Sequence, residues 1–350
     1  MFTLLAGLNT LGIVVFIFHL SIFALLCSLM FVRAYLFPRH FLKSLTRPIE
    51  CFYFPAFWLT IATILSCTAE YGVGTHHSER EWLVRALRVV FWLYAGCTVT
   101  TTWLQYWAFI RFTPSNVFEM NPAWFLPGYA VMLTGTLASL VARSQPAESR
   151  VPILIAGLTY QGYGFLTSYL FSVLYFARLM NSGMPPRDFR PGLFLTVGQV
   201  GYTITAFMGL ANHIPRDYGY FAEHPESAEI LQVMALFTSI FLWLFGFFMF
   251  GLAFLGTIET VPSIGFTLSW WAFVFPNVGF TLATIVIGRA LRSEGILWLA
   301  SAMTILSVAI WLFDLLAMSR AVWIKRIMWP GRDEDKDRLF KRHARPAVGS

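Results

Sequence analysis

The run ILQVMALFTSIFLWLFGFFMFGLAFLGTI, which occupies residues 230–258, decides the class of fold. It contains no charged side chain, and it exceeds the roughly 20 mostly apolar residues that a helix needs to cross a bilayer. Apolar and polar residues do not alternate along it, as they would in a half-buried strand. Because a backbone in lipid must satisfy its own hydrogen bonds, this run predicts a transmembrane helix.

Other stretches of the chain share this length and composition. Nine predicted spans in all cover residues 11–34, 52–72, 83–109, 123–142, 151–180, 191–212, 230–258, 264–288 and 296–325. Only 12% of the 350 residues are charged, against about 25% in an average soluble domain. We therefore expect an all-α polytopic membrane protein, with a transmembrane domain at residues 1–328 and a disordered cytoplasmic tail at residues 329–350.

The distribution of basic residues predicts the orientation of these spans. The formal charge is +7, but Lys and Arg occur in short segments between apolar runs, which argues against a nucleic-acid-binding stripe. Of the 25 Lys and Arg residues, 17 fall on the side that holds the C-terminal tail. Because cytoplasmic loops carry the excess of basic residues, we expect a cytoplasmic C-terminus and, with nine spans, an external N-terminus.

Proline occurs within three residues of aromatic side chains in alternate spans only. The four positions are Pro55, Pro127, Pro191 and Pro276. An interior proline removes a helical hydrogen bond and kinks the helix, which a membrane tolerates where the helix faces protein or an aqueous cavity. The intervening spans lack an internal proline, so we predict a repeat of one broken inner helix and one straight outer helix. The proline spacing places a fifth broken helix before Met1, and we expect that this helix is missing from the chain.

Five segments follow one another along the chain: Asn121–Pro127, Tyr160–Gly164, Arg190–Phe194, Trp271–Phe280 and Pro330–Asp335. In sequence and in order they resemble the tellurite-resistance/dicarboxylate transporter family, and within it the fungal malic acid permeases. The resemblance implies ten helices in five hairpins around a central pore, cytoplasmic termini and homotrimers. It begins one helix late, in agreement with the proline spacing. The chain departs from the family pattern at Gln199, where relatives carry a proline pair, and at Asp314, where relatives look apolar.

Several polar residues in or beside the spans are candidates for the pore. Arg190 precedes a broken helix, and its planar guanidinium matches a carboxylate; the alternative is a loop arginine that fixes topology. The uncharged candidates are Thr134, Gln161, Gln199 and Asn277, each of which could instead form a hydrogen bond between helices. The resemblance further implies that Phe275 is the aromatic gate of the pore.

Transport of C4-dicarboxylates such as malate through a central pore is the function that these features favour. Sulfite or another small inorganic anion is the alternative on the same fold, and a membrane-embedded enzyme or a receptor is less favoured, because the polar residues are too scattered for an active site. We expect no enzymatic activity, metal or cofactor, and a plasma-membrane location. The place of Asp314 in an outer helix favours a structural or interfacial role. The sequence leaves open whether a proton is coupled, and Asp314 would then be the candidate carrier.

Overall fold

The structure, a computed structural model, describes residues 6–46, 51–73, 80–112, 116–260 and 265–329. Within these ranges the chain is helical and contains no strand. The α-helices are α1 (Ala6–Leu36), α2 (Pro38–Thr46), α4 (Pro55–Cys67), α5 (Glu81–Phe112), α6 (Leu126–Ala142), α7 (Ala147–Ser182), α8 (Leu195–Asn212), α9 (Tyr220–Glu223), α10 (Ser227–Ile258), α11 (Phe275–Ala290) and α12 (Glu294–Trp323). The predicted tail lies outside the described residues, except for Trp329.

The predicted all-α polytopic class is confirmed. Eight described helical segments are long and apolar enough to cross a membrane, and each overlaps one predicted span. The remaining prediction, residues 151–180, lies within α7, a continuous helix of 36 residues. Its length is sufficient for a span, but α7 does not meet the combined criterion of length and composition that the other eight satisfy.

Short non-α segments accompany the proline-containing helices. A 3₁₀-helix precedes each of three of them: η5 (Pro122–Phe125) before α6, η6 (Arg187–Phe194) before α8, and η8 (Leu268–Phe273) before α11. Helix α4 instead continues into a π-helical segment, η2 (Thr68–Val73). The interruptions in α6, α8 and α11 therefore come at the start of the α-helix.

The prolines lie where a missing N–H group costs little. Pro55 begins α4, while Pro127 and Pro276 are the second residues of α6 and α11. Pro191 lies within η6. The first N–H groups of a helix have no intrahelical acceptor, so proline is compatible with these positions.

The prediction that the intervening spans lack an internal proline is wrong for α7, which contains Pro152. This proline is only the sixth residue of the helix. The carbonyl of Glu148, four residues earlier, is therefore the only one that loses its helical donor. A single lost hydrogen bond in the second turn is compatible with a continuous helix.

Burial separates most of the broken helices from the straight ones. The apolar windows of Pro122–Ala142 and Arg187–Asn212 are 89% and 78% buried, whereas those of Ser227–Ile258 and Glu294–Trp323 are 17% and 6% buried. Helix α4 departs from this pattern, because its window is 22% buried against 33% for α5. The helices α6 and α8 are thus mostly buried, whereas α10 and α12 expose apolar side chains, as helices that contact lipid do.

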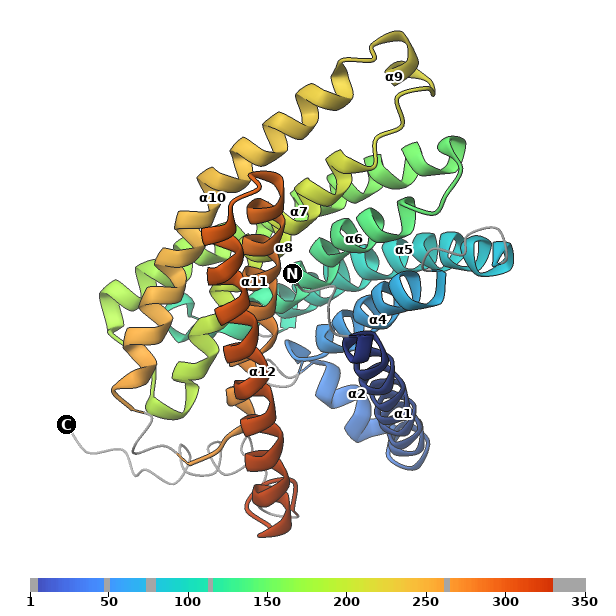
Figure 1. Cartoon of the computed structure of the whole chain (residues 1–350). Coiled ribbons are helices and arrows are strands. Elements are labelled where there is room, and N and C mark those ends of the chain that lie inside the picture. The colour runs from blue at the N-terminus through green and yellow to red at the C-terminus, as the bar shows by residue number, and fades with distance from the viewer. Residues whose placement is uncertain (1–5, 47–50, 74–79, 113–115, 261–264, 330–350) are drawn as a thin grey trace, which may run out of the picture. The chain divides into compact units, whose positions relative to one another are not determined.

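The described chain divides into two compact units. Unit 1 comprises Met1–Asn116, Trp124–Phe171 and Thr205–Phe237, and unit 2 comprises Val117–Ala123, Ser172–Ile204 and Thr238–Ser350. The boundaries fall inside α7, α8 and α10. Helices α5 and α6 lie side by side in unit 1, and α11 and α12 form a hairpin in unit 2 (Figure 1).

Candidate functional site

The junction between η8 and α11 carries two of the predicted site residues. Pro276 has no N–H, and the chain turns from the 3₁₀-helix into the α-helix at Val274 (φ −87°, ψ −69°). The side-chain Nδ2 of Asn277 donates to the carbonyl of Phe273 at 2.8 Å. Asn277 therefore satisfies a main-chain acceptor at the break. Its buried Oδ1 has no hydrogen-bond partner among the described residues.

Phe275 is held at this junction by Tyr202 of α8. Their rings stack with centroids 4.8 Å apart and planes at 28°, which is a favourable offset geometry for two aromatic rings. The hydroxyl of Tyr202 also donates a hydrogen bond of 3.0 Å to the main-chain carbonyl of Phe275. Both the ring and the backbone of Phe275 are thus fixed by one side chain.

Two glycines bring α8 and α11 into close contact beside this pair. A Cβ on Gly201 would lie 2.4 Å from main-chain atoms of Gly279 and Phe280, and a Cβ on Gly279 would lie 2.7 Å from the ring of Tyr202. Small residues at helix interfaces let membrane helices approach this closely. Gly201 and Gly279 therefore make possible the stacking between Tyr202 and Phe275.

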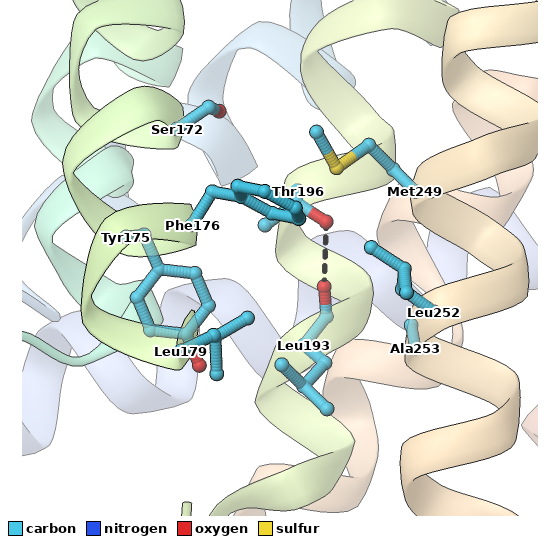
Figure 2. A pocket seen from close by; sticks show the side chains of 9 residues that line it. All are labelled: Ser172, Tyr175, Phe176, Leu179, Leu193, Thr196, Met249, Leu252 and Ala253. Carbon is cyan, nitrogen blue, oxygen red and sulfur yellow. Dashed lines mark hydrogen bonds between the residues drawn. The ribbon is translucent and has the colours of Figure 1, made fainter. Parts of the chain in front are cut away.

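Gln199 lies one turn before Tyr202 on α8 and is completely buried. Its Nε2 donates to Oγ of Ser172 on α7 at 2.6 Å. Ser172 lines a small pocket between α7, the η6–α8 segment and α10 (Figure 2). In the wall of this pocket, the Thr196 hydroxyl donates a hydrogen bond of 2.8 Å to the Leu193 carbonyl. The volume of about 20 Å³ holds about one water molecule and is far too small for a dicarboxylate.

Arg190 lies in η6, and its guanidinium contacts the C-terminal end of α10. Nε donates to the carbonyl of Pro185 at 3.1 Å, and Nη1 donates to the carbonyl of Gly256 at 2.9 Å. Nη1 also lies 3.4 Å from a carboxylate oxygen of Glu259. The arginine side chain is 16% exposed. A cation at this position satisfies terminal carbonyls and complements the negative end of the helix dipole.

The other two polar candidates lie in unit 1. Gln161 of α7 packs against Gly135 of α6. A Cβ added to Gly135 would lie 2.4 Å from Oε1 of Gln161. The neighbouring Thr134 is completely buried, and its hydroxyl has no hydrogen-bond partner among the described residues. The candidates thus form two groups, with Thr134 and Gln161 in unit 1 and Arg190, Gln199, Phe275 and Asn277 in unit 2.

Asp314 is the one ionisable side chain among the described residues of α12 that is completely buried. Neither carboxylate oxygen has a hydrogen-bond partner within the described part of the chain. Ala300 and Ala321, the other buried residues of α12, lie at multiples of seven residues from it, which places all three on one helix face. A charged carboxylate in such a setting is strongly disfavoured, so a neutral, protonated Asp314 fits this position.

One end of unit 1 is rich in arginine. A hollow of about 440 Å³ is lined there by Glu81, Val84, Arg85, Arg88, Ser144, Gln145, Pro146 and Glu148. Arg85 forms a 2.9 Å ion pair with Glu81.

His213 lies close to arginines of the same unit. Burial is the main cause that lowers the pKa of His213, and the charges of Arg143 and Arg150 lower it further. A hydrogen bond to the main chain of Gly209 acts in the opposite direction and raises the pKa. The imidazole is therefore neutral at neutral pH, and arginines supply the positive charge.

Tyr202 and Ser172 were not among the residues predicted from the sequence. Tyr202 follows the Gly198–Gly201 stretch, but nothing local indicates that its partner lies 73 residues further on. Ser172 is likewise an ordinary polar residue of a long helix. Among the described residues, no group of three His, Cys, Asp or Glu side chains could hold a metal ion.

Apolar helices, proline interruptions at helix starts and mostly uncharged polar residues in the buried helices define an integral, multi-pass membrane protein. Residues 1–319 match the family described as "SLAC1: Voltage-dependent anion channel". The chain therefore belongs to this family, as the resemblance in its sequence indicated.

Three relatives show what proteins of similar sequence do. The chain is 29% identical, over 95% of its length and 78% of the relative, to a Schizosaccharomyces pombe protein provisionally named as a malic acid transport protein. It is 27% identical, over 94% of its length and 75% of the relative, to the malic acid transport protein of the same yeast. It is also 26% identical to the sulfite efflux pump SSU1 of Trichophyton rubrum, over 87% of the chain and 80% of the pump.

Proposed function

We propose that this protein transports C4-dicarboxylates such as malate across a membrane, along a path lined by its broken helices. The observation that carries the proposal is the similarity to two malic acid transport proteins over 94–95% of the chain. Membership of an anion-channel family supports the anionic substrate. The role is transport and not catalysis, because these relatives are named for transport.

The proposed path combines several partial charges with one cation. An anion in a low-dielectric interior needs polar partners, and interrupted helices supply free N–H groups at the positive end of a helix dipole. Thr134, Gln161, Gln199 and Asn277 are the proposed polar contacts. Arg190 is proposed as a cationic contact through Nη2, since its Nε and Nη1 already bind main-chain carbonyls.

Phe275 is the proposed gate of this path. Its side chain is half-buried at the η8–α11 junction, where an aromatic ring can close a narrow passage by filling and dewetting it. In this proposal, the ring moves to a second position in which the passage is open.

Malate and sulfite are distinguished by uptake in a host that lacks its own dicarboxylate carrier. We expect cells that express the chain to accumulate labelled malate, and we expect their tolerance of added sulfite to stay that of the empty host. The matched control is the same chain with Gly201→Leu, which forces α8 and α11 apart. Sulfite tolerance without malate uptake would establish the sulfite alternative and remove malate as the substrate.

A coupled proton is part of the proposal, with Asp314 as its carrier. Helix α12 packs on α11 and η8; η8 has no ionisable residue, and Arg289 of α11 lies at the opposite end of the hairpin. Glu294 begins α12, and Arg320 in its last turn is exposed. Asp314 is therefore remote from compensating charges and exchanges a proton only when water reaches it.

Asp314→Asn tests this role. Asn keeps the size and a neutral form but cannot release a proton, so we expect malate uptake to lose its dependence on external pH while the apparent affinity for malate stays within about twofold, as no substrate contact is removed. Glu148→Gln, at an exposed position, is the control. An unchanged pH profile in the Asp314→Asn protein would exclude Asp314 as the proton carrier.

Orientation, location and assembly complete the proposal. The distribution of Lys and Arg supports a cytoplasmic C-terminus, and a role in taking up an external acid would place the protein in the plasma membrane. The homotrimer rests on the resemblance to the family. A tag with a protease site can be added to the C-terminus to test the orientation. If the C-terminus is cytoplasmic, protease added to intact cells should not remove the tag, and protease added to opened cells should remove it.

A further inference from the structure

The contacts between α8 and α11 suggest how the proposed gate is kept closed. We infer that Tyr202 is the latch of Phe275, a positioning residue that sets how much anion passes through the resting protein. This inference rests on the proposed function, because it assigns a partner to the gate that the function requires.

The first observation is that Tyr202 holds Phe275 by two separate contacts. The ring centroids lie 4.8 Å apart, and the tyrosine hydroxyl donates to the Phe275 carbonyl at 3.0 Å. A stack alone would allow the phenylalanine backbone to rotate at the junction. The hydrogen bond opposes that rotation at the residue that must move, because it binds the main chain of Phe275 itself.

The second observation is that Phe275 lies at the junction where the 3₁₀-helix η8 ends and α11 begins. Pro276 contributes no N–H, and the segment before it is a short 3₁₀-helix whose last turn is closed by a 3.2 Å bond from Val274 to Trp271. Residues at element ends absorb the dihedral changes of a gating motion. A bond to the carbonyl of Phe275, the first residue of α11, therefore acts at the end of an element and not in a helix interior.

The third observation is that Tyr202 itself has little freedom to move. It is 6% exposed, and Gly279 leaves just enough room for its ring, since a Cβ there would lie 2.7 Å from Cε2. Gly201, the residue before Tyr202, lets α8 and α11 approach closely, since a Cβ there would lie 2.4 Å from main-chain atoms of α11. The latch is thus built on the rigid α8–α11 contact, and the gate is the part that moves.

Tyr202→Phe tests the latch, because it removes the hydroxyl and keeps the ring. We expect the resting malate current of cells expressing the full chain, normalised to the protein at the surface, to rise about fivefold, the effect of one lost net hydrogen bond on a closed–open equilibrium. Tyr202→Leu, which also removes the stack, should raise it further. A purely structural role for Tyr202 would lower the normalised current instead.

The matched control is Tyr106→Phe. The hydroxyl of Tyr106 donates to the carbonyl of Trp124 at 3.0 Å, so it also binds main chain at a 3₁₀-to-α junction, but one that carries no proposed gate. We expect the resting current of this variant to match that of the wild type. An equal rise in Tyr106→Phe and Tyr202→Phe would mean that any loosened junction leaks, and would overturn the latch.

The background of Phe275→Ala separates the latch from the gate. If Tyr202 acts through Phe275, then Tyr202→Phe should add nothing when the phenylalanine ring is already gone. Two outcomes would reject the latch and leave the gate unaffected. In the first, Tyr202→Phe raises the resting current of the Phe275→Ala protein as much as that of the wild type. In the second, Tyr202→Phe leaves the wild-type current unchanged, although Phe275→Ala raises it. If Phe275→Ala itself leaves the current unchanged, the gate fails.

Discussion

Replacing Phe275 with alanine should raise the resting anion current by about tenfold or more. Burial of a Phe side chain contributes about 1.5–3 kcal/mol, and about 1.4 kcal/mol corresponds to a factor of ten in an equilibrium. The ring is half-buried and stacked on Tyr202, so the lower part of that range applies. Voltage clamp of cells bathed in malate gives the measurement.

The control for this prediction is Phe254→Ala. Phe254 lies on α10 in the same unit and is 46% exposed, so it faces outward from its helix. Its removal should leave the resting current unchanged. A Phe275→Ala protein that reaches the surface in normal amount and conducts no more than the wild type would show that the ring does not obstruct the path.

Replacing Gly201 with alanine should destabilise the protein by about 1–3 kcal/mol or more, the usual cost of overpacking. The new Cβ would lie 2.4 Å from main-chain atoms of Gly279 and Phe280. Backbone atoms cannot rotate away as a flexible side chain can, so α8 and α11 must separate. Thermal unfolding of the detergent-purified protein should begin at a clearly lower temperature than in the wild type.

The matched control is Gly251→Ala, in α10 of the same unit. A Cβ at Gly251 meets no atom within 4 Å, and alanine favours a helix interior by about 0.5–1 kcal/mol over glycine. This variant should unfold at the wild-type temperature or slightly above it. Equal stability of the Gly201→Ala and Gly251→Ala proteins would contradict the close contact between α8 and α11.

The sequence predicts the helices well because apolar length is a property of each segment alone. Residues 230–258 were predicted as a span and form most of α10 (Ser227–Ile258), and residues 296–325 nearly coincide with α12 (Glu294–Trp323). The helix ends differ by a few residues because polar residues such as Ser293 cap or extend a helix beyond its apolar run. Ser293 Oγ accepts from the N–H of Ile296.

The candidate site was only partly predictable, because its contacts join segments far apart in the sequence. The aromatic–proline motif indicated a break near Pro276, yet not that a 3₁₀-helix would precede it or that Asn277 would cap it. Tyr202 could not be assigned to Phe275 from any local pattern. The residue type of Arg190 was compatible with a substrate contact or with a loop role, and only the structure shows that two of its nitrogens bind main-chain carbonyls and leave Nη2 for the proposed contact.

Flux of malate through the purified protein tests the central claim most directly. Vesicles that contain the full chain as the only protein, loaded with buffer and placed in labelled malate, should accumulate the label faster than empty vesicles do, and the Phe275→Ala protein should accumulate it faster still. The helical content of both reconstituted proteins should be equal. Vesicles with well-folded protein that take up malate no faster than empty ones would contradict the claim that this chain transports dicarboxylates.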